Sequence, residues 1–180
     1  MTARVIEVGG REKPEGGDMK LPTLSDPVRL AISIAIPLAA GALGSVFTAR
    51  SVTTWYTTLA KPTFSPPSWV FGPVWTALYV LMGISLFLVW RKGLGYPHVK
   101  TGLGLFAVQM ALNAFWSIAF FGLRSPLAGL VVIGALLLML ILTIVTFFRV
   151  ALAPGLLLVP YVVWVSFASI LNGGLYALNR

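Results

Sequence analysis

The sequence contains no cysteine, and none of its residues after Asp26 is acidic. Without cysteine the chain can form neither a disulfide framework nor a thiolate site. The absence of Asp and Glu beyond position 26 excludes paired-carboxylate catalysis, carboxylate proton relays and hard-cation sites from that region. The single histidine, His98, lies in the short polar stretch RKGLGYPHVK, where we expect a solvated side chain rather than a metal or haem ligand. We therefore expect no metal site and no resident cofactor.

Charged residues of both signs are scarce as well. Only 10% of the 180 residues are charged and 58% are hydrophobic, whereas about 25% of the residues of a soluble domain are charged. This composition is typical of a membrane protein. The net charge of +8 does not indicate nucleic-acid binding, because most basic residues flank apolar segments, where they set membrane topology.

Five apolar segments have the length of about 20 residues that a bilayer requires. They cover residues 28–48, 68–90, 103–123, 127–148 and 155–178. In the second segment, Trp69 and Trp90 stand 21 residues apart, which corresponds to about 31 Å of helix and suits one ring at each membrane interface. The pattern predicts an all-α integral membrane protein, a five-transmembrane-helix bundle formed by residues 28–180 in a lipid bilayer.

Residues 1–27 are polar, of mixed charge and without the apolar core of a signal peptide, so we expect a disordered N-terminal tail. Within this tail, the stretch EGGDM can be encoded with a bacterial ribosome-binding signal directly ahead of Met19. One hypothesis is therefore that translation begins at Met19 and that residues 1–18 are not translated. The alternative is a tail that is present and disordered.

The distribution of basic residues predicts the orientation of the chain. With five spans, the tail lies on the same side as the connections after the second and fourth spans, and that side carries nine of the 13 basic residues. Because basic residues concentrate on the cytoplasmic side, we expect a cytoplasmic N-terminus. The opposite side carries the remaining four, Arg50, Lys61, Arg124 and Arg180.

Polar and aromatic side chains recur at helical spacing inside three of the spans. They are Trp75 and Tyr79 in the second span, Gln109, Asn113 and Trp116 in the third, and Tyr161, Trp164, Ala168, Leu171 and Asn172 in the fifth. An unbonded amide in hydrocarbon costs about 1–3 kcal/mol, so we expect these amides to face the protein interior. One interpretation is packing, in which the amides bond across helices and the tryptophans fill the core.

The other interpretation is a binding site, and it rests on depth. Trp75, Trp116, Ala168 and Asn172 all fall in the half of the bundle nearest the connection at 49–67. Converging flat aromatic rings with a few neutral hydrogen-bonding groups suit a large, planar, mostly apolar ligand. The four basic residues on that side, Arg50, Lys61, Arg124 and Arg180, would form a rim that pairs with ligand carboxylates.

Three stretches, WYTTLAKPTFSPPSWVFGPVWTALYVLMG, QMALNAFWSIAFFG and VPYVVWVSFASILN, resemble the signature segments of the TspO/MBR family, and the resemblance runs from about Pro37 to Asn172. It implies a five-helix membrane bundle that binds porphyrins such as protoporphyrin IX, and in some members sterols and drug ligands, and that often forms homodimers. It also implies a pocket under a lid formed by the 49–67 connection, with the matching residues Asn113, Trp116, Trp164, Ala168 and Leu171.

The chain departs from the family pattern at Phe64, where most members carry a tryptophan. That tryptophan, with the one that matches Trp164, is associated with light-dependent porphyrin breakdown in bacterial relatives. Phenylalanine can stack on a porphyrin but is much harder to oxidise. We therefore expect degradation to be slow or absent, with Trp164 as the catalytic candidate.

Two further departures concern the family's sterol motif and its dimer face. Gly173 and Ala177 stand where the vertebrate sterol motif has Tyr and Arg, so sterol recognition has little support. The glycine pair that forms dimers in some members becomes Gly104 and Val108. A close-packing face is nevertheless kept by small residues, Ala107, Ala111 and Ala114.

Three functions are compatible with these observations. The first is a membrane receptor or binding protein that captures, buffers or transports porphyrins, and the second is a light-dependent porphyrin-degrading enzyme. The third, a small transporter or channel of another class, needs intramembrane charges for ion coupling, and the spans contain none beyond Arg29, the second residue of the first span. Porphyrin binding is the function we expect.

Overall fold

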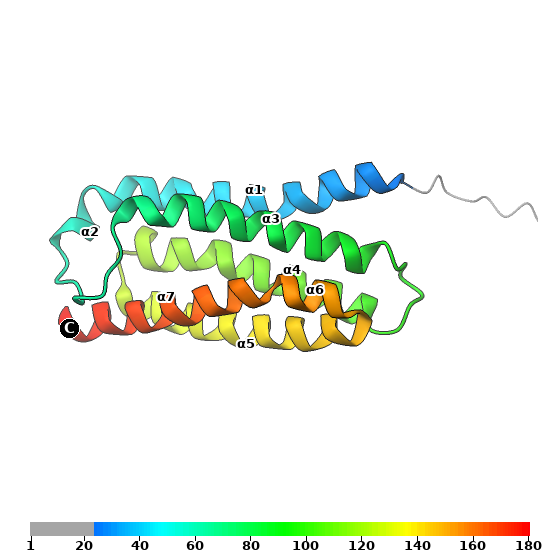
Figure 1. The fold of residues 1–180 in the computed structure, drawn as a ribbon. Helices are drawn as coiled ribbons and strands as arrows, with labels where there is room; N and C mark the ends of the chain where they lie inside the picture. The colour runs from blue at the N-terminus through cyan, green and yellow to red at the C-terminus, as the bar shows by residue number, and fades with distance from the viewer. Residues whose placement is uncertain (1–23) are drawn as a thin grey trace, which may run out of the picture.

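The computed structural model describes residues 24–180, and within that range the chain consists of helices and connecting loops, with no strand (Figure 1). Five stretches are long and apolar enough to cross a membrane: Asp26–Val52, Ser68–Trp90, Val99–Gly122, Pro126–Val150 and Leu152–Leu178. The predicted five-helix membrane bundle is confirmed, with span ends that differ from the expected ones by up to four residues. Most of the expected tail, including the possible start at Met19, lies outside the described residues.

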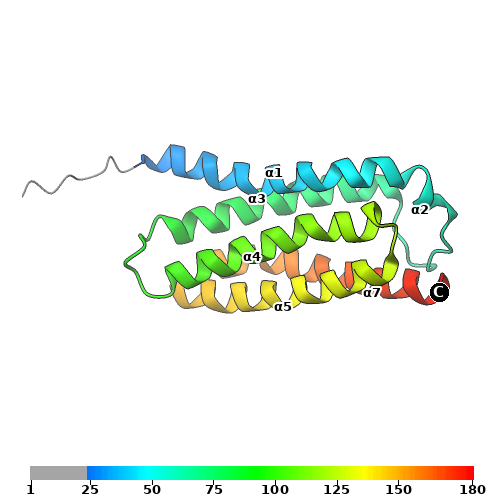
Figure 2. The ribbon, with the colours of Figure 1, turned by 180° about the vertical axis from the view of Figure 1, so that it is seen from behind.

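The elements follow one another in the order α1 (Asp26–Val52), α2 (Trp55–Thr58), η1 (Ser68–Val70), α3 (Phe71–Trp90), α4 (Val99–Ser117), η2 (Ile118–Gly122), α5 (Pro126–Val150), α6 (Leu152–Leu157) and α7 (Val159–Leu178). The long helices lie side by side along one axis, and the two opposite views agree on this arrangement (Figures 1 and 2). We call the end that holds α2 and the C-terminus the loop-1 end, after the connection at 53–67. The end where α1 begins is the tail end.

The expected range 155–178 implied one continuous helix for the fifth span, but the structure has two. The span divides into α6 and α7 at Leu158 because Pro160 has no amide hydrogen to continue the helical pattern. The amide of Leu158 instead donates to the carbonyl of Gly155 at 3.2 Å, and regular bonding resumes when Val162 donates to Leu158 at 3.1 Å.

The third span ends in a wider turn. Ile118–Gly122 is π-helical, and the amide of Leu123 donates to the carbonyl of Ile118 at 2.8 Å. This turn brings Phe120 and Phe121 into buried positions at the loop-1 end. The next helix then begins with Ser125 as N-cap, whose hydroxyl accepts from the amide of Ala128 at 3.2 Å.

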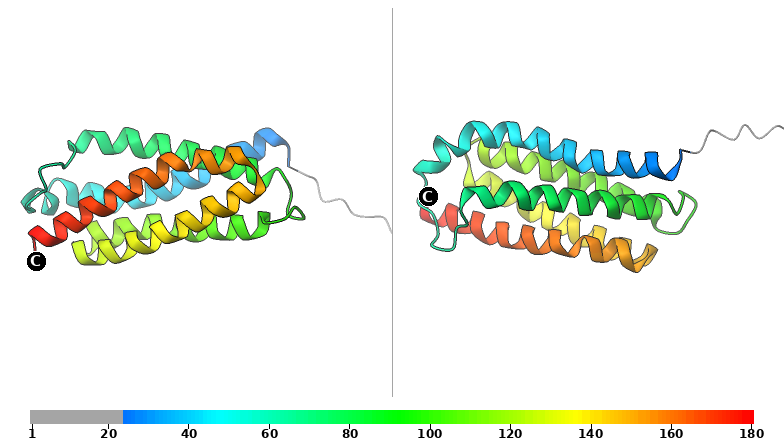
Figure 3. Two further views of the ribbon diagram at one scale, coloured as in Figure 1. Left: turned by 60° about the horizontal axis from the view of Figure 1, so that its bottom comes forward. Right: turned by 45° about the horizontal axis from the view of Figure 1, so that its top comes forward.

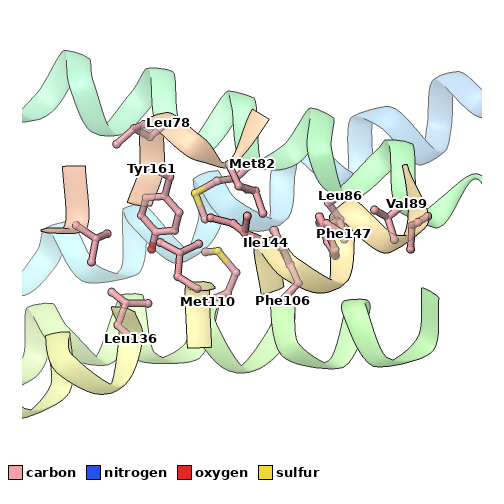
Figure 4. Packing of buried hydrophobic residues seen from close by; sticks show 14 of the residues in the cluster. Leu78, Met82, Leu86, Val89, Phe106, Met110, Leu136, Ile144, Phe147 and Tyr161 are labelled. Atoms are coloured by element: carbon pink, nitrogen blue, oxygen red, sulfur yellow. The ribbon is translucent and has the colours of Figure 1, made fainter. Parts of the chain in front are cut away.

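The tail half of the bundle is densely packed. Met82, Leu140 and Phe147 are completely buried there (Figure 4 shows Met82 and Phe147). The rings of Phe106 and Phe147 stack with centroids 6.0 Å apart. Gly83 lies so close to Ile34 and Ser33 that a Cβ atom would overlap the backbone of α1. Such packing leaves little free volume in this half.

Candidate ligand-binding site

A cavity of about 490 Å³ lies in the loop-1 half of the bundle, between α1, α3, α4 and α7. This volume is within the range of about 300–1,000 Å³ that is usual for small-molecule sites. Eight of the ten expected ligand-binding residues line it: Trp75, Tyr79, Asn113, Trp116, Trp164, Ala168, Leu171 and Asn172. The two that do not are Gln109 and Phe64, which was expected to stack on a porphyrin. Tyr161, which shares a helical face with Trp164, also lies outside the lining.

The aromatic walls of the cavity are built from three helices. On α3, Trp75 stacks on Tyr79 with ring centroids 5.4 Å apart and planes 28° apart. On α4, Trp116 stacks on Phe120 of η2, also at 5.4 Å. Trp164 of α7 meets Phe71 edge to face at 5.8 Å. Each tryptophan is therefore held in place by a second ring, which keeps the indoles rigid around the cavity.

The floor of the cavity is a hydrogen-bonded chain that joins three helices. The hydroxyl of Tyr79 donates to Oδ1 of Asn113 at 2.9 Å, and Nδ2 of Asn113 donates to the hydroxyl of Tyr161, also at 2.9 Å. Tyr161 is completely buried and Asn113 is 4% exposed. Because these polar groups satisfy one another, they can lie in the membrane without water.

A second amide fixes the position of a wall tryptophan. Oδ1 of Asn172 accepts from the indole Nε1 of Trp116 at 3.2 Å, and Nδ2 of Asn172 donates to the carbonyl of Pro126 at 2.7 Å. The side chain thus connects α7 to α4 and to the start of α5. Asn113 and Asn172 therefore bond across helices, as the packing interpretation expected, and they also line the cavity.

Gln109 lies one helical turn beyond Asn113 toward the tail end, so it is below the cavity floor. It is completely buried, and neither atom of its amide has a hydrogen-bond partner within the described part of the chain. Its burial agrees with the expectation that the amides face inward. Its place outside the lining removes it from direct contact with a ligand in this cavity.

The wall formed by α1 was not expected from the sequence. Most of its residues are small: Gly41, Ala42, Ser45 and Thr48 lie between Leu38 and Val52. At Gly41 a Cβ atom would overlap the ring of Tyr79, so this glycine makes room for the phenol that bonds Asn113. Small residues carry no polar or aromatic signal, and therefore sequence reasoning missed them; Phe71 and Phe120 were missed because phenylalanine is common in any apolar span.

The cavity is closed at the loop-1 end by Tyr56 of α2. Its ring is 8% exposed and packs against Phe120 and Phe121, with centroids 6.3 and 5.8 Å apart. The ammonium group of Lys61 lies 4.5 Å from the centroid of the same ring. Burial raises the pKa of the Tyr56 phenol, so the ring stays neutral near pH 7.

The side chain of Asn179 attaches loop 1 to the C-terminal end of α7 by hydrogen bonds. The amide of Ala60 donates to Oδ1 of Asn179 at 2.9 Å, and Nδ2 of Asn179 donates back to the carbonyl of Ala60 at 2.9 Å. Nδ2 also donates to the carbonyl of Leu175 at 2.8 Å. The Asn179 side chain therefore bonds both the amide and the carbonyl of Ala60, as a neighbouring backbone strand would. No sequence motif predicted this contact.

Phe64 lies in loop 1 outside the cavity. Its side chain is 49% exposed and meets Phe167 edge to face, with ring centroids 6.4 Å apart. The centroid of Phe167 in turn lies 5.6 Å from that of Trp164.

The expected rim residues are all exposed and lie at the loop-1 end, but none of them lines the cavity: Arg50, Lys61, Arg124 and Arg180. Asp26 is the one acidic residue in the described range, and it begins α1 at the opposite end of the bundle, the tail end.

Comparison with known proteins gives a consistent result. The family model described as the TspO/MBR family matches residues 33–178. The chain is 49% identical over 150 residues to the tryptophan-rich protein TspO of Chlorobaculum tepidum, which covers 83% of this chain and 95% of that protein. It is 50% identical over 153 residues to the tryptophan-rich protein TspO of Archaeoglobus fulgidus, with 84% and 97% covered. The translocator protein of Homo sapiens is 38% identical over 133 residues, with 72% and 78% covered.

Proposed function

The chain belongs to the TspO/MBR family, and on that premise we propose that it binds porphyrins such as protoporphyrin IX inside the membrane and buffers or moves them. The observation that carries the proposal is the cavity in the loop-1 half, lined by Trp75, Trp116 and Trp164 from three different helices. Flat indole faces suit a flat aromatic macrocycle, because offset stacking adds about 0.5–1.5 kcal/mol per ring pair beyond the burial of area.

The charge of the site supports the same ligand class. No charged side chain lines the cavity, so the buried part of the ligand is neutral and apolar. The loop-1 end carries four exposed bases, Arg50, Lys61, Arg124 and Arg180, and no acid among the described residues. A porphyrin combines these properties, with an apolar ring and propionate groups that pair with bases at the membrane surface. The porphyrin is the ligand, and the proposal needs no resident cofactor.

Homodimer formation is part of the proposal as well. The outer face of α4 exposes Gly104, Ala107 and Ala111 between larger apolar side chains, Val108 and Phe115. Small residues let two helix backbones approach closely in lipid, where van der Waals packing holds helices together.

Light-dependent degradation receives less support than binding. Phe64 replaces the second oxidisable ring, and its side chain is half-exposed outside the cavity, with Phe167 between it and Trp164. Illumination of the porphyrin complex separates the two functions. A binding protein leaves the porphyrin absorption spectrum unchanged, whereas a degrading enzyme bleaches it.

A protoporphyrin titration of the purified protein, followed by quenching of tryptophan fluorescence, tests the proposal. We expect saturable binding by the parent. Trp164→Leu and Asn113→Leu should each raise the Kd about tenfold, which corresponds to about 1.4 kcal/mol. Trp90→Leu is the matched control, since Trp90 ends α3 at the tail end and its replacement should leave the Kd unchanged.

The outcomes separate two kinds of failure. If the parent does not bind protoporphyrin, the proposed function is wrong. If the parent binds but all three variants bind equally well, the function stands and the ligand lies elsewhere than in this cavity.

A further inference from the structure

The residues that line the cavity differ from side to side in their exposure. Those from α4, η2 and α7 are buried or half-buried, and so are Val52 and Tyr56 at the loop-1 end. The exposed lining residues all come from α1 or from the first part of the α3 span: Leu38, Ala42, Ser45, Ser68, Gly72 and Thr76. Residues that are exposed and also line a cavity mark its opening. The cavity therefore opens sideways, between α1 and α3.

These six residues form the two edges of a slot. On α1 they recur at intervals of four and three residues, and on the α3 span at every fourth residue, so each set lies along one helix face. The two helices run antiparallel and side by side (Figures 1 and 3). Counting in opposite directions from the contact of Gly83 with Ile34 brings Ser45 level with Gly72. We call this opening the α1–α3 slot.

The slot ends where the two helices approach each other closely. Gly83 packs on Ile34, and Gly41 packs on the ring of Tyr79. Toward the loop-1 end the facing residues are small, and Gly72 has no atom within 4 Å of where its Cβ would lie. The opening thus extends from about the level of Tyr79 to the membrane interface at Ser68.

The slot is chemically suited to the hydrocarbon that surrounds both helices. The hydroxyl of Ser45 donates to the carbonyl of Ala42 at 2.7 Å, and the hydroxyl of Thr76 donates to the carbonyl of Gly72 at 3.0 Å. Both hydroxyls are satisfied within their own helices, and the third hydroxyl of the slot, on Ser68, lies at the membrane interface. The part of the slot within the hydrocarbon therefore presents no unpaired donor to lipid or to a passing apolar ligand.

We propose that the ligand enters and leaves the cavity directly from the bilayer, through the α1–α3 slot, rather than from water beneath loop 1. The inference rests on the proposed function, and it adds that the ligand is drawn from molecules already dissolved in the membrane. A planar lipophilic acid fits this route. Its ring lies in hydrocarbon beside the slot, while its carboxylates stay at the interface near Arg50, which follows Ser45 by five residues on α1.

The closed loop-1 end supports this route. Tyr56 fills the space above the cavity and packs against Phe120 and Phe121. Asn179 holds loop 1 on α7 through paired hydrogen bonds to Ala60. A ligand arriving from water would have to break both arrangements, whereas the slot is already open between small side chains.

A reversible cross-link tests the route, because the chain contains no cysteine of its own. Ser45→Cys and Gly72→Cys together place one thiol on each edge of the slot. A short bifunctional thiosulfonate reagent joins the thiols, and a reductant removes it, so the same protein is measured with the slot bridged and open. The matched control is the pair Ala60→Cys and Asn179→Cys, which ties loop 1 to α7 and closes the aqueous route instead.

The readout is the rate at which protoporphyrin loaded beforehand is released to empty acceptor vesicles. We expect the slot bridge to slow both release and uptake at least tenfold, with recovery on reduction, and the loop-1 bridge to change them less than twofold. A bridge that merely damaged the cavity lining would weaken binding and speed release, which is the opposite sign.

Two results would overturn the inference while leaving the proposed function intact. One is release from the bridged slot at the rate of the open protein, and the other is equal or greater slowing by the loop-1 bridge. If the reduced protein and the parent both fail to take up protoporphyrin, the proposed function itself fails, and the route proposed for that ligand fails with it.

Discussion

Some residues of this protein both allow helices to pack closely and shape the cavity, and Gly41 is the clearest example. A side chain at this position would overlap the ring of Tyr79, which donates to Asn113 in the chain of hydrogen bonds at the cavity floor. The glycine is thus required by the position of an aromatic ring on another helix, and its own backbone is ordinary helix.

We predict that Gly41→Ala displaces Tyr79 and lowers both stability and ligand affinity. The overlap should cost about 1–3 kcal/mol, the usual range for an overpacked core position. Unfolding in mixed detergent micelles and the protoporphyrin titration measure the two effects. Gly134→Ala is the control, because no atom lies within 4 Å of its Cβ position. It should leave the affinity unchanged and should not lower stability, since alanine is the better helix former inside α5. Equal behaviour of the two variants would contradict the role assigned to Gly41.

At the scale of elements, loop 1 is held at two places. Its first part packs on η2 through Tyr56, and its second part is attached to α7. Asn179 supplies three hydrogen bonds, two to Ala60 and one to Leu175. Gly174 adds to this attachment, because a Cβ atom there would overlap the ring of Pro62. The end of α7 therefore determines where the second part of the loop lies.

We predict that Asn179→Leu frees loop 1 without unfolding the bundle. Loss of these hydrogen bonds, each contributing about 0.5–1.5 kcal/mol, should accelerate hydrogen exchange in residues 57–64 by about tenfold or more. Exchange in the middle of α4 should stay as in the parent. Ser169→Ala serves as control, because its hydroxyl bonds within its own helix, to Val165. Unchanged exchange in the loop would show that other contacts hold it.

At the scale of the whole molecule, the bundle has two unlike halves. The tail half is filled by completely buried side chains such as Met82, Leu140 and Phe147. The loop-1 half contains the cavity and is bounded by four exposed bases, Arg50, Lys61, Arg124 and Arg180. The orientation of the molecule therefore decides from which leaflet the α1–α3 slot can accept a ligand.

We predict that the tail end faces the cytoplasm and the loop-1 end faces outward, since nine of the 13 basic residues lie on the tail side. The cysteine-free chain allows a direct measurement with single cysteines. In intact cells a membrane-impermeant maleimide should label Arg180→Cys and leave Lys92→Cys unlabelled until the cells are opened. The reverse pattern would invert the orientation and assign the slot to the other leaflet.

The sequence by itself determined the membrane bundle and most of the aromatic and polar cavity wall. Span length and the absence of charge are local properties, so the five helices could be read without knowledge of their neighbours. Asn113, Trp116 and Trp164 were predictable because polar groups in hydrocarbon need partners and recur on one helix face. The break at Leu158 was less predictable, since the apolar run continues through it.

Only the tertiary structure decided the α1 wall, the slot and the attachment of loop 1. Gly41, Ala42 and Gly72 carry no chemical signal of their own, and their importance comes from which helix lies opposite. Asn179 and Ala60 are 119 positions apart, so their contact exists only after five helices have packed. Gln109 and Phe64 were expected to line the cavity and do not, for the same reason. Periodicity shows which face of a helix a residue occupies, whereas its depth along the bundle, and the path of a loop, depend on how the whole chain folds.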